Sequence, residues 1–294
     1  MFTVNTENLI RFCELIQSRD LKITWSCSSR TDVLTKDVIK KMAHSGCENI
    51  YFGIESGSKS LQSSTNKRLD LNESLKIIEI CSKNNIEPTC SFIFGFPDEK
   101  ESELLDTLDL ITQLYFVNVF NIQLHLFTPF PKTKETEKII NQAYFDPNGR
   151  NLSIGEVYNF TSRGLELIKE RKNLFISYYT FDTEVRNKYR YLDVLIESFG
   201  VAKDLFRFEI KRMLRKTSLK DIYLRNEKRI MQVYKLISDL TISNPSKINK
   251  MLYNLTFNIL NYEKKVFESK EEKKVFEIHT IALNMMNQDL QMPG

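Results

Sequence analysis

The chain has 294 residues, with 42 basic and 38 acidic side chains and a net charge of +4. Because 41% of the residues are hydrophobic, it can bury one large core or two smaller ones, which excludes a disordered, collagenous or disulfide-stapled protein. Nine glycines and seven prolines are few for this length and favour helices over turn-rich sandwiches. No apolar run reaches the roughly 18 residues of a membrane span and no export signal is visible, which predicts a reducing, cytoplasmic setting.

The first half of the sequence alternates between two hydrophobic periods. Helical spacing at residues 9–16 precedes a strand at Leu21–Cys27, and an amphipathic helix follows at Val33–Met42. The same alternation continues with strands at Asn49–Glu55, Glu87–Phe94 and Val117–Phe127 and helices at Leu71–Lys83 and Glu101–Tyr115. Four strands separated by crossovers of this length predict an α/β fold with a parallel sheet.

The pattern changes after Pro129, where the strand signal fades. Prolines and glycines gather before Gly155, and helical periodicity dominates afterwards, interrupted clearly only at Asn244-Pro245. We therefore expect three parts: residues 1–135 with the parallel sheet, a connection at 136–155, and a helical C-terminal domain at 156–294.

Polar residues and glycines follow each predicted strand. The four segments are Ser26–Arg30, Gly53–Ser58, Phe94–Glu99 and Thr128–Thr133. Ligands of parallel sheets gather at the carboxyl ends of the strands, where loops expose helix N-termini and backbone donors. Four such ends in register predict one shared pocket.

Glu55 ends an apolar run, where a carboxylate is costly unless a ligand or a cation satisfies it. The alternative is an ordinary salt bridge or a helix N-cap. Gly53, Gly57 and Gly95 leave room for a ligand to approach the backbone, although each alone is also typical of a turn. Arg30 suits a carboxylate and Glu55 suits two ribose hydroxyls, but spacing alone assigns neither role.

Other candidate groups favour structural roles. The five cysteines form no CxxC and no zinc pattern, so their spacing gives no iron–sulfur ligand set. Cys27 and Cys90 lie near strand ends, where buried, inert thiols are favoured over ligands. His125 shares a strand face with Gln123 and Phe127, as a pocket residue or a core histidine. Lys203–Arg229 holds ten basic and four acidic residues, and a solvated helical face is favoured there over a nucleic-acid surface.

The ordered motifs between Phe2 and Thr133 resemble the later part of the barrel of radical S-adenosylmethionine (radical SAM) enzymes, in particular the group whose members often carry a cobalamin-binding domain. The matching pieces are FTVN, ITWSCSSR, MAHSGC, IYFGIESGS followed by Leu61 and Lys67, SFIFGFPDE and FTPFPKT. The resemblance implies a partial (β/α) TIM-like barrel of parallel strands followed by an all-α C-terminal extension.

The resemblance also implies a set of cofactor-binding residues. Glu55 and Ser56 match polar positions that contact the ribose of S-adenosylmethionine, on the strand that carries Gly53 and Gly57. The backbone from Ile93 through Gly95 to Pro97 would pass along the adenine. Arg30 would point toward the methionyl carboxylate or the substrate.

The chain departs from the family pattern in two ways. Asp98 and Lys132 stand at turn positions where the family usually has glycine. The CxxxCxxC loop that holds the [4Fe-4S] cluster, and the first two barrel strands, have no counterpart here, so we expect a fragment that begins partway through the barrel. The Leu21–Cys27 strand would then be an open sheet edge, which predicts poor solubility unless the missing part is supplied.

The sequence thus predicts an enzyme of radical SAM type whose complete form cleaves S-adenosylmethionine at a [4Fe-4S] cluster, for radical modification or for methyl transfer through cobalamin. The implied partners are a small-molecule or peptide substrate and an electron donor such as flavodoxin or ferredoxin. The alternative, favoured by the missing cysteine loop and the two glycine replacements, is a non-catalytic remnant or a partner-binding helical module.

Overall fold

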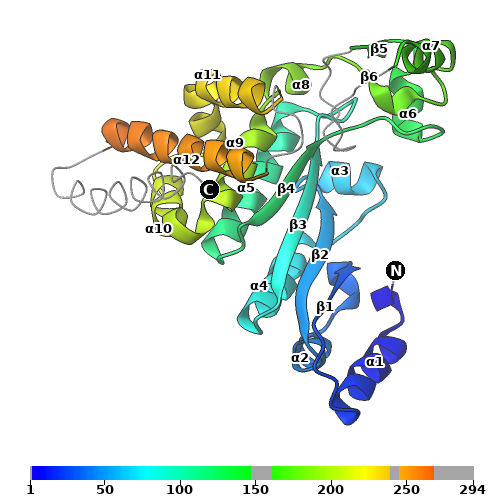
Figure 1. Cartoon of the computed structure of the whole chain (residues 1–294), viewed down its shortest axis with the longest axis vertical. Helices are drawn as coiled ribbons and strands as arrows, with labels where there is room; N and C mark the ends of the chain where they lie inside the picture. Colours follow the sequence, from blue (N-terminus) through cyan, green and yellow to red (C-terminus); the bar gives the residue numbers. More distant parts are fainter. Residues whose placement is uncertain (1, 147–160, 239–244, 268–294) are drawn as a thin grey trace, which may run out of the picture.

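The computed structural model describes residues 2–146, 161–238 and 245–267 (Figure 1). In chain order, the first elements are η1 (Phe2–Val4), α1 (Thr6–Ser18), β1 (Trp25–Ser29), η2 (Thr31–Val33), α2 (Lys36–His44), β2 (Cys47–Glu55), α3 (Lys59–Ser64), α4 (Leu71–Lys83), β3 (Glu87–Phe94), α5 (Glu101–Phe116) and β4 (Asn121–Leu126). The later elements are α6 (Lys134–Ile139), β5 (Tyr144–Phe145), α7 (Ser162–Glu170), η4 (Ile176–Tyr178), β6 (Tyr179–Thr180), α8 (Glu184–Lys188), α9 (Leu192–Val201), α10 (Lys203–Leu214), α11 (Leu219–Ser238) and α12 (Pro245–Phe267).

The four longer strands form one parallel sheet in the order β1-β2-β3-β4. Because all three pairings are parallel, the four carboxyl ends lie at one edge (Figure 1). The predicted α/β class is confirmed, and the sheet with its helical C-terminal part is a partial barrel of the expected kind. None of the helices among the described residues combines the length and the apolar character needed to cross a bilayer.

One face of this sheet forms the main hydrophobic core. Alternate residues of the strands are buried there beneath the helices: Ile50, Phe52 and Ile54 of β2, Cys90, Phe92 and Phe94 of β3, and Ile122, Leu124 and Leu126 of β4. Burial of each large apolar side chain contributes about 1.5–3 kcal/mol, which fixes the strand register because a one-residue slip would turn this row outward.

The opposite face, called the open face below, is mostly polar. It carries Ser26, Ser28, Asn49, Tyr51, Gly53, Glu55, Thr89, Ser91, Ile93, Asn121, Gln123 and His125. Most of these residues are half-buried or exposed, and they stand in cross-strand rows such as Gly53, Ser91 and Gln123. Parallel sheets normally cover both faces, so a polar face on this sheet is a place for ligands.

The C-terminal helices join the same core. Buried Leu192, Leu195 and Phe199 of α9 belong to the cluster that contains the strand residues, and α9 packs beside β4 (Figure 1). Phe199 meets Tyr115 of α5, with ring centroids 6.1 Å apart. The predicted boundaries near residues 155 and 294, and Asn244, lie outside the described residues.

The predicted and observed element bounds differ most at the sheet's outer strands. β1 begins at Trp25 rather than Leu21, because residues 21–24 are exposed and lie outside the ladder. β4 begins at Asn121 rather than Val117, since α5 continues to Phe116 and Asn118 takes a left-handed φ of 66° in the turn. The short antiparallel pair β5–β6 carries too few residues to show a period-2 pattern in the sequence.

β1 forms the sheet edge among the described strands, since it pairs with β2 on one side only. The η1 segment packs beside it, and Trp25 contacts the rings of Phe2 and Phe12 edge-on, with centroids 6.4 and 5.3 Å away. The expected poor solubility stays a prediction.

Candidate functional site

Predicted site residues lie at the carboxyl ends of β1, β2 and β3, along the same edge as the end of β4. Arg30 follows β1, Glu55 ends β2, Gly95 follows β3, and Phe127 follows β4. The backbone amide of Phe127 donates to the carbonyl oxygen of Phe94 at 2.7 Å, so the last two loops start side by side.

Glu55 has an unusual backbone for its residue type. Its φ is 69°, in the left-handed region, and the register of β2 against β3 shifts between Gly53 and Glu55. A non-glycine residue in this region is strained by about 1–2 kcal/mol, and such strain is characteristic of functional sites. The bulge turns the Glu55 carboxylate toward Lys67, whose Nζ lies 3.0 Å from Oε1.

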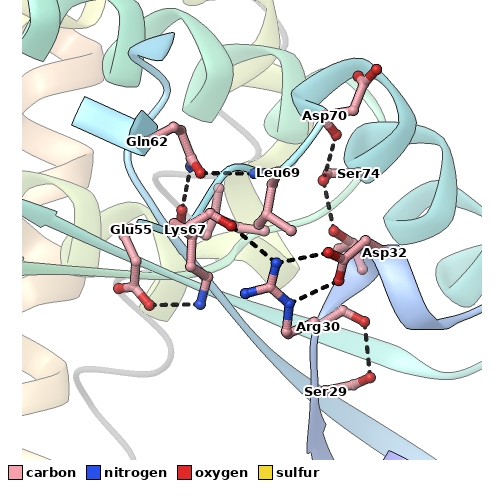
Figure 2. Close-up of polar contacts among 11 residues, drawn as sticks. Ser29, Arg30, Asp32, Glu55, Gln62, Lys67, Leu69, Asp70 and Ser74 are labelled. Atoms are coloured by element: carbon pink, nitrogen blue, oxygen red, sulfur yellow. Dashed lines mark hydrogen bonds and ion pairs between the residues drawn. The ribbon is translucent and has the colours of Figure 1, made fainter. Parts of the chain in front are cut away.

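Arg30 lies beside this ion pair and contacts the backbone of Lys67 (Figure 2). Its Nε and one terminal nitrogen donate to the two carboxylate oxygens of Asp32 at 2.9 and 2.7 Å, and that terminal nitrogen also donates to the carbonyl oxygen of Lys67 at 3.0 Å. The hydrogen bond from Arg30 lowers the pKa of Asp32. The planar fork predicted to hold a carboxylate therefore holds Asp32, and Arg30 reaches Glu55 through Lys67.

Gly53 makes room for this arrangement. A Cβ at Gly53 would lie 2.6 Å from Oε1 of Glu55 and 3.2 Å from Nζ of Lys67. A side chain at that position would displace the ion pair.

The residues that follow Glu55 face the helices instead. The Ser56 hydroxyl lies 3.0 Å from that of Thr107 on α5, and the Gly57 amide donates to the same oxygen at 3.0 Å. A Cβ at Gly57 would meet the backbone of Asp106 at 2.4 Å, so Gly57 is required by packing. The structure thus groups Glu55, Gly53 and Arg30 but turns the Ser56 hydroxyl away from them, and a ribose contact by Ser56 stays a prediction.

Gln62 of α3 fixes this turn from within. Its amide nitrogen donates to the carbonyl oxygens of Ile54 and Ser56 at 2.7 Å each, and its amide oxygen accepts from the Leu69 amide at 3.2 Å. The buried side chain thereby links the end of β2 to the segment that carries Lys67 (Figure 2).

The loop after β3 is held from both sides. Gly95 has φ 76°, and its amide and that of Phe96 donate to Oε2 of the buried Glu99. Arg186 of α8 donates to the carbonyl oxygens of Gly95 and Phe127 at 3.1 and 2.9 Å. Burial raises the pKa of Glu99 to about 7 and lowers that of Arg186 to about 10.

Ile93 and Pro97 flank this loop, and the predicted contact of this backbone with an adenine stays a prediction. Ile93 pairs with His125 on the open face, and Pro97 is half-buried. The sequence analysis did not identify Glu99 or Arg186 as residues of the site. Glu99 is the second acidic residue of the GFPDE motif and could have been noticed there, whereas no local sequence signal marks Arg186.

The two glycine replacements differ in the structure. Lys132 keeps a left-handed φ of 63°, the conformation that glycine adopts without strain, whereas Asp98 is not in that region. The turn at Asp98 is therefore of another type, and Asp98 makes an ion pair with Lys138 of α6 at 2.7 Å.

The five cysteines, all within the described residues, lie in the core away from this edge, and four are buried. Burial raises the pKa of Cys81 to about 12 and raises those of Cys13 and Cys90 as well. No group of three potential ligands in the described ranges could hold a metal ion. The residues present therefore do not fit a [4Fe-4S] cluster.

Anaerobic treatment of this chain with iron and sulfide is expected to leave no stoichiometric cluster, because its thiols are scattered and mostly buried. Iron and sulfide analysis after desalting, with a visible absorption spectrum, measures this. A stable cluster on the isolated chain would contradict the result, and replacement of partly exposed Cys27 by serine would then show whether this thiol is a ligand.

The fold and the loops at its carboxyl edge define a partial parallel barrel with a candidate nucleotide-binding edge. Residues 2–111 match the family model described as radical SAM superfamily. This confirms the resemblance inferred from the motifs.

Two curated relatives extend the comparison. An uncharacterized methyltransferase of Pyrococcus horikoshii is 30% identical over 183 residues, which cover 60% of this chain and 39% of the relative. A tRNA-2-methylthio-N(6)-dimethylallyladenosine synthase of Lachnoclostridium phytofermentans is 31% identical over 91 residues, covering 30% of this chain and 20% of that enzyme. The chain spans about two fifths of the first relative's length and about one fifth of the second's.

Two solved structures are also similar. The cobalamin-dependent radical enzyme OxsB with aqua-cobalamin and S-adenosylmethionine bound gives a TM-score of 0.42 at 15% identity, covering 98% of this chain and 46% of OxsB. The methyltransferase TsrM of Kitasatospora setae, with cobalamin and a [4Fe-4S] cluster bound, gives 0.43 at 14% identity, covering 73% and 50%.

Proposed function

We propose that the edge formed by Glu55, Gly53 and the Gly95 loop binds the adenosyl part of S-adenosylmethionine, and that the chain contributes this site to a radical SAM methyltransferase or oxidoreductase. The strained Glu55 at the β2 bulge supports this proposal most directly, because its half-buried carboxylate stands at the carboxyl edge within the matched residues 2–111.

Each residue has a defined task under this proposal. Glu55 accepts hydrogen bonds from the ribose hydroxyls, while Lys67 holds its carboxylate in place through their ion pair. The backbone of Ile93–Pro97 contacts the adenine, and Arg30 acts as a positioning residue through the Lys67 carbonyl oxygen. A [4Fe-4S] cluster would require ligands other than this chain's cysteines. The proposal also includes a small-molecule or peptide substrate, an electron donor such as flavodoxin or ferredoxin, and a cobalamin.

Substitution Glu55→Gln is expected to weaken S-adenosylmethionine binding about tenfold, because a charge-assisted hydrogen bond of about 1.5–3 kcal/mol becomes a neutral one. Isothermal titration of the chain with S-adenosylmethionine measures the dissociation constant. Glu48→Gln, an exposed position on the same strand, is the matched control and should leave the constant unchanged. Equal binding by the Glu55→Gln variant would remove Glu55 from the site.

A further inference from the structure

Helix α10 and its C-cap residue carry a row of cations along one side. The row consists of Lys203, Arg207, Lys211 and Arg215, called the basic row below. These residues stand four apart, and positions with this spacing are neighbours on a helix surface. At a rise of about 1.5 Å per residue the row is roughly 18 Å long. The sequence favours a solvated face here, because charge alone does not distinguish a solvated helix from a binding surface.

The first half of the basic row is neutralised by acids. Nζ of Lys203 lies 2.5 Å from a carboxylate oxygen of Glu87 at the start of β3, and it donates to the amide oxygen of Asn121 at the start of β4. A terminal nitrogen of Arg207 lies 3.4 Å from the carboxylate of Asp204. The contacts of Lys203 place the row at the amino ends of β3 and β4, the opposite end of the sheet from the proposed cofactor edge (Figure 1).

Among the described residues, the second half of the basic row forms no ion pair with an acid. Lys211 donates to the neutral amide oxygen of Asn118 at 2.7 Å, and the guanidinium carbon of Arg215 lies 6.0 Å from the Phe116 ring centroid. Partial burial lowers the pKa of Lys211, and the charges of Arg215 and Arg207 lower it further. The three cations therefore lie close enough to repel one another, and an anion placed on them would relieve this repulsion.

Two exposed aromatic rings flank the same half of the row. Phe208 is 75% exposed, more than any other large apolar side chain in the described ranges. It stands three residues before Lys211 and seven before Arg215, so it shares their side of α10. Phe116, at the end of α5, is 38% exposed beside Arg215. A single exposed ring is common on protein surfaces, but here two rings adjoin cations that make no ion pair.

The combination of cations and rings selects one ligand chemistry. A strand of nucleic acid carries one negative phosphate per nucleotide, which complements a regular row of cations. Unpaired bases stack on aromatic side chains, and arginine adds cation–π attraction. An acidic protein segment would occupy the cations but leave the rings uncovered, and a duplex keeps the faces of its bases stacked inside. The surface therefore favours a single strand.

An anionic membrane also attracts cations and aromatic rings together. A helix that lies in a membrane interface buries a whole apolar face in the lipid. The apolar face of α10 is instead buried in the protein core, where it contributes Phe206, Ile210 and Met213. Phe208 is the one large apolar side chain of α10 that is exposed. One ring can stack on a base but is too small an apolar area to hold a helix in lipid.

We propose that the basic row and Phe208 form a docking surface for single-stranded nucleic acid, with phosphates on Arg207, Lys211 and Arg215 and an unpaired base stacked on Phe208. The surface lies at the other end of the sheet from the edge assigned to S-adenosylmethionine. It therefore holds a strand rather than a reacting group, and its assignment does not depend on the proposed function.

The test uses a fluorescein-labelled oligouridylate of about 12 nucleotides, titrated with the full chain in about 50 mM salt and followed by fluorescence anisotropy. Saturable binding is expected, and the logarithm of the association constant should fall linearly with the logarithm of the salt concentration. Lys211→Gln/Arg215→Gln should weaken binding at least tenfold and reduce that slope by about 1.4, since each phosphate contact on a single strand contributes about 0.7. Lys36→Gln/Lys40→Gln, an exposed pair with the same spacing on α2, is the matched control and should change neither quantity.

A second variant tests the ring separately. Phe208→Leu keeps the charge and the apolar character but removes the aromatic face, so it should weaken binding at least fivefold with an unchanged salt dependence. Because Phe208 is 75% exposed, this change leaves the fold intact, which far-ultraviolet circular dichroism verifies. Undiminished binding by the double variant or by Phe208→Leu would overturn the proposal. Equal or tighter binding of a polyglutamate of the same length, of the matching duplex or of phosphatidylserine vesicles would overturn it as well.

Discussion

Arg186→Met is expected to lower the free energy of unfolding by roughly 3–5 kcal/mol, the scale for removing one partner of a buried charged network. Arg186 is 3% exposed, and its guanidinium carbon lies over the Phe181 ring, 4.0 Å from the ring centroid. It donates to the carbonyl oxygens of Phe181, Gly95 and Phe127 at 2.9, 3.1 and 2.9 Å. Methionine fills the space but leaves these oxygens without their donor, and each unsatisfied buried group costs about 1–3 kcal/mol.

Urea denaturation of the parent chain and the variant measures this difference. Arg207→Met is the matched control, because Arg207 on α10 is more exposed and its contact with Asp204 at 3.4 Å is a surface ion pair. The control is expected to change the unfolding free energy by less than about 0.5 kcal/mol. A loss below about 1 kcal/mol in Arg186→Met would show that the carbonyl oxygens find other donors.

Glu99→Gln is expected to stabilise the fold at pH 8 by roughly 2–3 kcal/mol and to have little effect at pH 4. Burial raises the pKa of Glu99 from 4.5 to about 7 in the folded chain. Below pH 4.5 the carboxyl is protonated in both states. Between pH 4.5 and 7 the unfolded chain releases its proton first, so stability falls as pH rises and stays reduced above 7. Glutamine can still accept from the Gly95 and Phe96 amides without this cost.

The free energies of unfolding of the parent chain and the Glu99→Gln variant, measured between pH 4 and pH 8, test this expectation. Asp98→Asn removes a negative charge at the exposed neighbouring position, where the side chain is 73% accessible, and serves as the control. If the difference between Glu99→Gln and the parent chain stays constant with pH, the Glu99 carboxyl does not titrate in this window.

The sequence was most informative where one hydrophobic period dominates. Strand β3 and helix α4 have the predicted bounds, Glu87–Phe94 and Leu71–Lys83. Their apolar residues face the core, and a shift of either element by one residue would expose them to water. The predicted start of β1 at Leu21 was wrong, because Leu21 and Ile23 are apolar but exposed, with 47% and 43% of their surface accessible. Apolar character alone could not reveal that these residues lie outside the ladder.

The candidate site was predictable only in part. Glu55 and Gly95 could be found because strand ends in a parallel sheet converge, and the sequence marks both with a change from apolar to polar residues. The cation that satisfies Glu55 proved to be Lys67, and the acid that occupies Arg30 proved to be Asp32. Neither pairing follows from spacing, since the first depends on a bulge and the second on the path of the loop after β1.

The hydrogen bonds of Arg186 have a consequence for how this protein could be recombined with its relatives. An exchange of the helices after α7 would remove the donor for Gly95 and Phe127 while leaving both loops in the recipient. A chimaera is therefore expected to fold stably only if the segment taken from the relative has an arginine at the position of Arg186. The fewest hydrogen bonds would be broken if the loop after β3, the loop after β4 and α8 all came from the same parent protein.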